Sequence, residues 1–212
     1  HSSMPDSLLK KPLISKIARC VEKYFLKHAS AVMTVSDDIS NRAKLDVSSD
    51  CVPVVTVNDI AMRFDSPIEN QKLIQIRQEC SNDIQEKLVI YTGNLQHYQG
   101  VQLLVETASV IKKNYPHLKV KIIVVGGANE EKDILNKFSK FVDDNNLSSY
   151  IVFLGQRPSS EMPYFMNIAD VLISPRVSGT NTPLKIYCYL DQAKPIVATN
   201  IESHTQVLND EN

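Results

Sequence analysis

The sequence lacks several features that would assign a protein to a class at once. No apolar run approaches the roughly 18–20 residues that a membrane-spanning helix needs, and tryptophan is absent. The 23 basic and 24 acidic side chains nearly cancel to a net charge of −1, so the chain has no overall basic field for nucleic-acid phosphates. It has no CxxC pair, no HExxH motif and no His at metal-ligand spacing. We therefore expect a soluble globular protein that binds neither nucleic acid nor a structural metal.

The cysteines indicate the compartment. Cys20, Cys51, Cys80 and Cys188 are widely spaced along the chain. Isolated, reduced thiols are typical of cytoplasmic proteins, and we expect that compartment here. Their even number leaves open a secreted protein with two disulfides.

Residues 86–212 alternate short apolar runs with amphipathic stretches. The runs are almost wholly apolar, as expected for strands covered on both faces, and lie at residues 88–92, 120–125, 150–154, 171–174 and 196–199. Apolar residues recur at helical spacing between them, and Asn129 is the expected N-cap of one such helix. Strand–helix alternation with right-handed crossovers predicts an α/β fold with a doubly wound, Rossmann-like parallel sheet.

The rest of the chain reads as a partial unit and a connection. Residues 1–58 contain two strand patterns and two helix patterns, too few for a complete domain, and we interpret them as the end of an incomplete N-terminal α/β domain. Residues 59–85 read as a hinge or linker that leads into a helix. Residues 86–212 then form the C-terminal domain, whose own end we expect to be missing.

The glycines mark the expected ligand-binding edge. All six follow the ends of predicted strands, in the loops 93–100, 126–129, 155–160 and 175–183. These loops share one edge of a parallel sheet, where such folds bind ligands in the crevice at which strand order reverses. Glycine lets the backbone approach a ligand closely, and a helix that begins just beyond offers free N–H groups to phosphate. The pattern predicts a nucleotide-type ligand.

The loop 175–183 carries the strongest signal. Gly179, Thr180, Asn181 and Thr182 form a glycine-and-cap sequence, and Pro183 suits the first turn of the helix that follows. Arg176 and Lys185 flank this expected anion site, although arginine and lysine are most often surface charges.

At this point the chain resembles a known family. The segments "GTNTPLKIYCYLDQAKPIVAT", "YTGNLQHYQGVQLLVETA" and "VFLGQRPSSEMPYFMNIADVLISP" resemble the donor-binding domain of retaining GT-B glycosyltransferases of family 4, the group 1 type. "AVMTVSDDI" and "VVTVNDIAMRF" look like the end of that family's N-terminal domain. The resemblance implies transfer of a sugar, with retention and without a metal, from a nucleotide diphosphate sugar to a hydroxyl of a glycan, lipid-linked or small-molecule acceptor. The donor is a substrate, and no cofactor is implied.

Four positions depart from the family pattern. Asn94 and Gln99 stand where the family usually has an Arg and a Lys that clamp the diphosphate, and Thr180 and Cys188 stand where it has two Glu. Either the phosphate contacts moved to Arg176, Lys185 and the helix N-terminus, or the donor site has decayed. The second interpretation leaves a non-catalytic nucleotide- or partner-binding module, and a sugar-nucleotide epimerase is a third possibility.

The resemblance implies a set of donor-binding residues and assigns no catalytic residue. Gln156 and Arg157 are included because the family contacts the base just after the third strand of this domain. The candidate donor-binding residues are Gly93, Asn94, Gln99, Gly100, Gly126, Gln156, Arg157, Arg176, Gly179, Thr180, Asn181, Thr182, Lys185 and Cys188.

One basic segment lies outside the expected site. Between Lys10 and His28, six basic residues face one acid, with apolar residues on the opposite side of the predicted helix. Such a helix either packs its apolar stripe on its own domain or lies on an anionic membrane. The second alternative would place the protein at the inner membrane face.

Overall fold

The structure is a computed structural model that describes residues 12–47, 52–57, 59–61, 67–127, 129–179 and 181–209. The chain divides into two compact units, His1–Asp59 and Ile60–Asn212. Each unit is described by itself.

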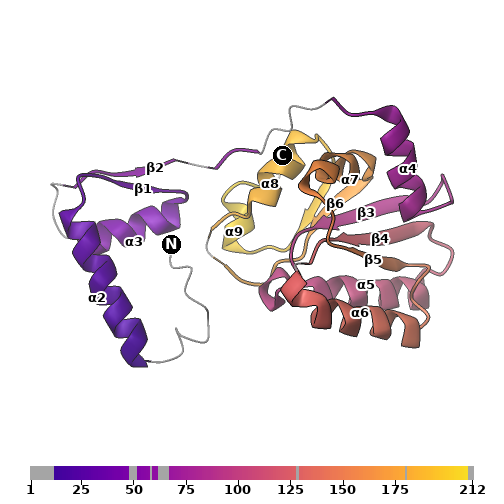
Figure 1. The fold of residues 1–212 in the computed structure, drawn as a ribbon, viewed down its shortest axis with the longest axis horizontal. Coiled ribbons are helices and arrows are strands. Elements are labelled where there is room, and N and C mark those ends of the chain that lie inside the picture. The colour runs from indigo at the N-terminus through magenta and orange to yellow at the C-terminus, as the bar shows by residue number, and fades with distance from the viewer. Residues whose placement is uncertain are drawn as a thin grey trace. The chain divides into compact units, whose positions relative to one another are not determined.

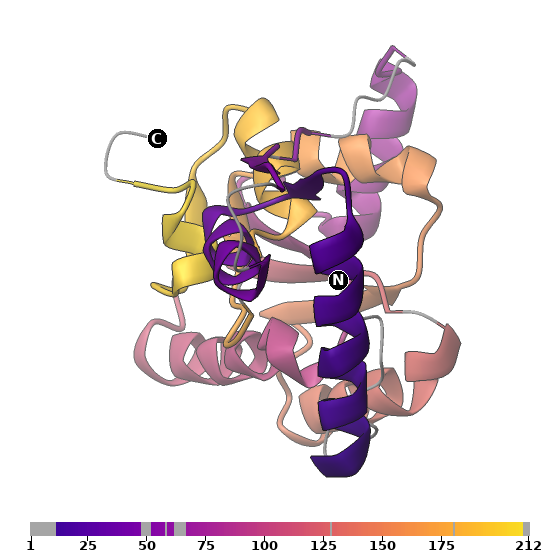
Figure 2. The same cartoon turned by 90° about the vertical axis from the view of Figure 1, so that its left-hand side faces the viewer.

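The first unit is small and open. It contains α2 (Pro12–His28), β1 (Val32–Thr34), α3 (Asp37–Val47) and β2 (Val54–Thr56), and the two strands pair in parallel. Asp37 and Asp38, in the first turn of α3, stabilise this helix because their negative charges lie near its partially positive N-terminus. Figure 2 shows α2, in indigo, as one uninterrupted helix.

The second unit is built on a parallel five-stranded sheet with the order β5-β4-β3-β6-β7. Its strands are β3 (Lys87–Thr92), β4 (Val120–Val125), β5 (Ile151–Gly155), β6 (Val171–Ser174) and β7 (Ile196–Ala198). The chain runs outward from β3 through β4 and β5, then returns to the other side of β3 as β6. The predicted doubly wound, Rossmann-like sheet is confirmed, because all four strand pairs are parallel.

Helices cover both faces of this sheet (Figure 1). On one face, α5 (Val101–Asn114) and α6 (Lys132–Asp144) pack on a core that includes Leu104, Ile122 and Ile151. On the other, α4 (Asn70–Cys80), α7 (Met162–Ile168) and α8 (Leu184–Asp191) pack on a core that includes Ile90, Phe165 and Tyr189. Burial on both faces explains why the strands are nearly continuous apolar runs. Short helices η1 (His97–Gln99), η2 (Asn129–Glu131), η3 (Ser159–Glu161) and α9 (Glu202–Thr205) complete the unit.

Two helix starts differ from the sequence prediction. Residues 129–131 form η2, and α6 begins at Lys132 with Glu131 as its N-cap, so Asn129 does not cap this helix. Pro183 is the N-cap of α8, with an extended ψ of 135°, instead of a residue of its first turn. The Pro183 carbonyl oxygen accepts the Ile186 N–H at 2.9 Å, while its extended ψ keeps Pro183 itself outside the helix, which begins at Leu184.

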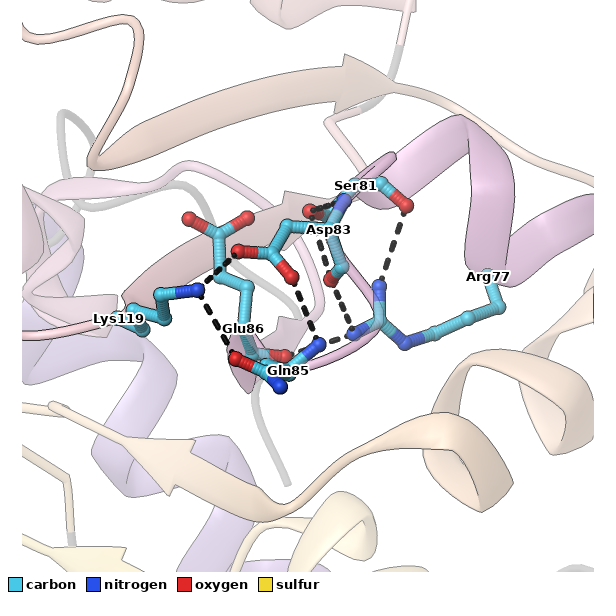
Figure 3. Close-up of polar contacts among 6 residues, drawn as sticks. All are labelled: Arg77, Ser81, Asp83, Gln85, Glu86 and Lys119. Carbon is cyan, nitrogen blue, oxygen red and sulfur yellow. Dashed lines mark hydrogen bonds and ion pairs between the residues drawn. The ribbon is translucent and has the colours of Figure 1, made fainter.

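The end of α4 is clamped to the start of β3 (Figure 3). Arg77 donates from Nη1 to the carbonyl oxygen of Ser81 at 3.3 Å, and from Nη2 to those of Asp83 at 3.2 Å and Glu86 at 2.7 Å. Lys119, just before β4, donates to the Asp83 carboxylate at 2.9 Å. Ile76 and Cys80 of α4 are buried in the core, and burial raises the pKa of the Cys80 thiol to about 11. The helix is therefore an integral part of the second unit.

Candidate functional site: a crevice at the sheet's switch point

The crevice lies where strand order reverses, between the loops that follow β3 and β6. These two strands are neighbours in the sheet, although 78 residues separate Thr92 from Val171 in the chain. The loops meet directly, because the Val177 N–H donates to the carbonyl oxygen of Tyr98 at 2.9 Å. The topology thus brings the two most informative stretches of the sequence together.

Two glycines allow the loops to approach so closely. Gly100 has a φ of +68°, and a Cβ there would overlap the carbonyl oxygen of Pro175. Gly126, after β4, has a φ of +126°, and a Cβ there would overlap the carbonyl oxygen of Gly93. The Gly127 N–H donates to that same oxygen at 3.2 Å. The loops after β3, β4 and β6 therefore form one backbone-packed layer.

Lys185 occupies the centre of this layer. Its Nζ donates to Oε1 of Gln99 at 3.1 Å and lies 4.0 Å from the ring centroid of Tyr91. Burial, with a smaller contribution from the charge of Arg176, lowers the pKa of Lys185 to about 7. Among the described residues, no carboxylate pairs with this amine. An unpaired cation in such a position favours binding of an anion.

Arg176 has a different position from the one its charge suggests. It is 7% exposed, and its guanidinium turns back on its own loop. Nε donates to the carbonyl oxygen of Ser178 at 2.7 Å, and Nη1 to that of Asn181 at 3.1 Å. A Cβ on Gly179 would overlap this guanidinium. Arg176 therefore folds the loop from within, and burial lowers its pKa.

The residues at the two family cation positions are both in the crevice layer. Gln99 is buried and bonded to Lys185, so the amine of Lys185 lies beside the position where the resemblance implies a lysine. Asn94 accepts a bond to its carbonyl oxygen from the Tyr91 hydroxyl at 2.6 Å, and its amide donates to the Tyr98 hydroxyl at 3.4 Å. The Tyr98 ring in turn lies 5.4 Å from Cζ of Arg176.

A buried histidine supports the loop after β6 from behind. His204 is 1% exposed, with Nε2 3.0 Å from the Ser174 hydroxyl and Nδ1 2.8 Å from the carbonyl oxygen of Thr199. The Thr199 hydroxyl donates to the carbonyl oxygen of Arg176. Burial lowers the pKa of His204, so its neutral form is favoured. Thr182 is also buried in this region, with its hydroxyl 3.5 Å from Oε1 of Gln206.

The remaining candidates lie elsewhere. Arg157 pairs with Glu79 of α4 at 2.9 Å and with Glu161 at 3.7 Å, and Glu161 also pairs with Lys72 of α4 at 2.8 Å. Its charge is engaged in this network instead of in the crevice. Gln156 is exposed, Cys188 is a partly buried free thiol beside the α8 core, and Thr180 lies outside the described residues.

Sequence reasoning missed four contributors to the site. Tyr91 and Tyr98 supply aromatic faces to the two cations, His204 supports the Arg176 loop, and Glu131 accepts bonds from the loop after β3. Only Tyr98 could have been suspected from the sequence, because it lies in the expected ligand loop between Gly93 and Gly100. The others lie in elements whose side-chain directions depend on the tertiary fold.

Over the described ranges, no three His, Cys, Asp or Glu side chains gather as metal ligands would. No helix in the part of the chain that the structure describes has both the length and the apolarity to cross a membrane.

A doubly wound sheet with a cation at its switch point defines a Rossmann-like domain, a class of fold in which ligands bind at this edge of the sheet. The family model for glycosyl transferases group 1 matches residues 86–212, and the chain belongs to this family. The GT-B relationship expected from the sequence is thereby confirmed.

Individual relatives are distant. The D-inositol 3-phosphate glycosyltransferase of Paenarthrobacter aurescens is 23% identical over 124 residues, which are 58% of this chain and 29% of that protein. HepE of Anabaena, solved with UDP and glucose, has a TM-score of 0.71 at 18% identity and covers 94% of this chain and 51% of its own. A glycosyltransferase of Rickettsia africae has a TM-score of 0.73 at 16% identity, with 99% and 52% coverage. This chain thus spans about half of these solved chains and under a third of the curated relative.

Proposed function

We propose that the second unit is the donor-binding half of a metal-independent, retaining glycosyltransferase that takes a hexose from a nucleotide diphosphate sugar. The diphosphate would lie against Lys185 and the glycine loops, and an acceptor hydroxyl would attack the anomeric carbon on the face that the nucleotide leaves. The acceptor would be a glycan, a lipid-linked molecule or a small molecule. Glycan biosynthesis in the cytoplasm is the setting we infer.

One observation carries this proposal. Lys185 holds an amine without a carboxylate partner, among the described residues, at the edge of the sheet where family members of this fold have their ligand crevice. It also provides a cation next to Gln99, and this cation could replace the lysine that family members usually have at the position of Gln99. Relocated phosphate binding is supported by this contact, whereas a decayed site would not need to retain a buried cation.

The experiment is a panel of UDP, GDP, ADP, dTDP and CDP, with their common sugar conjugates, tested by thermal shift on the full chain. A ligand at 100 times its Kd should stabilise the protein by about 2.7 kcal/mol, a shift of about 5–11 °C. A selective shift would identify the base. If no nucleotide shifts a demonstrably folded sample, the alternative of a non-catalytic partner-binding module is favoured. Interconversion of a bound donor without any acceptor would instead indicate an epimerase.

The pH dependence of binding gives a first prediction. Above pH 7.5 the terminal phosphate of UDP, with a second pKa of about 6, is fully ionised. The pKa of Lys185 is about 7 in the free site, and a bound diphosphate raises it. Binding therefore takes up a proton, and affinity for UDP should fall by up to about tenfold per pH unit as pH rises above 7.5. Calorimetry in two buffers of different ionisation enthalpy measures both effects. An affinity that stays constant from pH 7.5 to 9 would contradict the prediction.

We also propose that the protein contacts membranes through α2. Ile17, Val21, Tyr24 and Phe25 on this helix are 48–67% exposed, so much of the predicted apolar stripe is uncovered in the described unit. Lys16, Arg19 and Lys27 are exposed on the same helix, whereas Lys23 pairs with Asp46 at 2.9 Å. Aromatic and basic side chains together suit an anionic interface. Lys10 and Lys11, also part of the predicted basic segment, lie outside the described residues.

Vesicle sedimentation tests the membrane contact. Replacing Lys16, Arg19 and Lys27 with glutamine should weaken binding to vesicles containing anionic lipid by about 100-fold, since each basic side chain near the surface contributes about 1 kcal/mol. The matched control replaces three exposed lysines of the second unit, Lys112, Lys113 and Lys140, and should bind as wild type does. Equal vesicle binding by the two triple variants would contradict a membrane contact through α2.

A further inference from the structure

A buried carboxylate lies behind the crevice layer, in a place that the proposed ligand contacts do not use. Glu131, at the end of η2, is 2% exposed. Its Oε2 accepts the backbone N–H of Leu95 at 2.9 Å, and its Oε1 accepts the side-chain amide of Gln96 at 2.7 Å. The carboxylate therefore joins the segment after β4 to the loop after β3.

These bonds fix the loop immediately before the residue that contacts Lys185. The Tyr91 hydroxyl holds the carbonyl of Asn94, and Leu95 is 2% exposed in the core beneath α5. One turn of η1 follows, closed by the Gln99 N–H donating to the carbonyl oxygen of Gln96 at 2.8 Å. Once Leu95 and Gln96 are held, this turn sets the backbone position of Gln99, from which its side chain reaches Lys185.

We propose that Glu131 is a positioning residue that holds the loop 94–99 so that Gln99 meets the amine of Lys185. The proposal rests on the proposed function in so far as this pair binds phosphate. Glu131 acts through Leu95 and Gln96, whose N–H groups its carboxylate accepts.

The chemistry of the pair allows a test by exchange. Leu95 and Gln96 both offer N–H donors to the carboxylate, so Glu131 can accept from the two together. In Glu131→Gln the introduced amide can still accept from Leu95, and the Gln96 amide can turn to accept from it. In Gln96→Glu two carboxylates face each other at hydrogen-bond distance, which disfavours the loop arrangement. The double variant Gln96→Glu/Glu131→Gln restores a donor–acceptor pair.

The experiment follows the loop and the ligand separately. In the full chain, NMR reports the exchange protection of the Leu95 amide and the ¹³Cε shift of Lys185, and a titration gives affinity for inorganic pyrophosphate, which is independent of the base. We expect Gln96→Glu to lose Leu95 protection, to move the Lys185 signal and to weaken pyrophosphate binding by about tenfold. Glu131→Gln and the double variant should stay within about threefold of wild type.

The control is Gln75→Glu, which adds a charge at an exposed glutamine of α4 and should change nothing. Because Gln96 is also exposed, Gln96→Glu should remain folded. A Lys185 signal that does not move in Gln96→Glu, or a double variant no better than Gln96→Glu, overturns the proposal. If wild type binds no pyrophosphate while the Lys185 signal still follows the exchange pattern, the positioning role stands and the proposed function falls.

Discussion

Replacing Lys185 with methionine is expected to lower affinity for UDP by about 10- to 100-fold and, at the same time, to raise the melting temperature. The first effect follows because a hydrogen bond to a charged group contributes about 1.5–3 kcal/mol. The second follows because the amine is buried against Tyr91 and Gln99 with no carboxylate partner among the described residues. Methionine keeps the apolar stem and removes the charge, which we expect to stabilise the fold by about 2 kcal/mol, or about 4–8 °C.

The sign of the stability effect can be checked by pH. The pKa of Lys185 is lowered from 10.5 to about 7 in the folded protein, so the unfolded chain binds more protons between these values. Wild-type stability should therefore rise with pH over this range, and the advantage of Lys185→Met should shrink. Affinity for uridine, which lacks phosphate, should change little in this variant. Lys140→Ala, at an exposed lysine of α6, is the control. A variant that loses both UDP affinity and stability would indicate a structural role for Lys185.

The second large effect is expected at Gly100. Gly100 and Gly155 both have a φ of +68°, so an alanine at either position pays the same backbone penalty of about 1–2 kcal/mol. At Gly155 the nearest atom to an added Cβ is Cδ2 of Leu135, at 3.7 Å, an ordinary contact. At Gly100 the Cβ would overlap the carbonyl oxygen of Pro175, which belongs to the loop after β6. The two variants therefore share a positive φ and differ in what the added Cβ meets, which at Gly100 is the backbone of the neighbouring loop.

We expect Gly100→Ala to lower the melting temperature of the second unit by about 6–12 °C, which corresponds to about 3 kcal/mol, and Gly155→Ala by about 2–8 °C, which corresponds to about 1–2 kcal/mol. Differential scanning calorimetry measures both. Ligand affinity should fall in Gly100→Ala alone, because only that loop carries Gln99 toward Lys185. Equal losses of stability in the two variants would mean that the loops can separate without cost.

Much of the fold could be predicted because buried strands appear in the sequence as continuous apolar runs. The runs at residues 120–125 and 171–174 became β4 and β6 with the predicted bounds, since strands covered on both faces are apolar throughout. The edge of the sheet that carries the site followed from topology alone, because parallel strands all end on the same side. Neither inference needed to know where a side chain points.

Side-chain direction is what the sequence could not supply. Arg176 looked like a free phosphate ligand, yet its guanidinium bonds to the carbonyl oxygens of its own loop. Nothing in the sequence distinguishes an arginine that points outward from one that turns back. Lys185 and Gln99 are 86 positions apart, and their contact depends on how β3 and β6 pair. Glu131 lies at the end of η2, and its carboxylate accepts the backbone N–H of Leu95, 36 positions away in the chain, a contact that no local pattern indicates.

The clamp at the end of α4 has a consequence for exchanging parts between relatives. The family match begins at residue 86, which makes that position a natural place to join two proteins. A chimaera joined there would combine an α4 from one parent with the rest of the unit from another. Of the three carbonyl groups that Arg77 holds, that of Glu86 would then come from the other parent. The ion-pair partners of Lys72 and Glu79, which are Glu161 and Arg157, would also be foreign. Ile76 and Cys80 would have to fit a foreign core. Recombination upstream of Asn70 keeps these contacts within one parent and should give the better-folded hybrids.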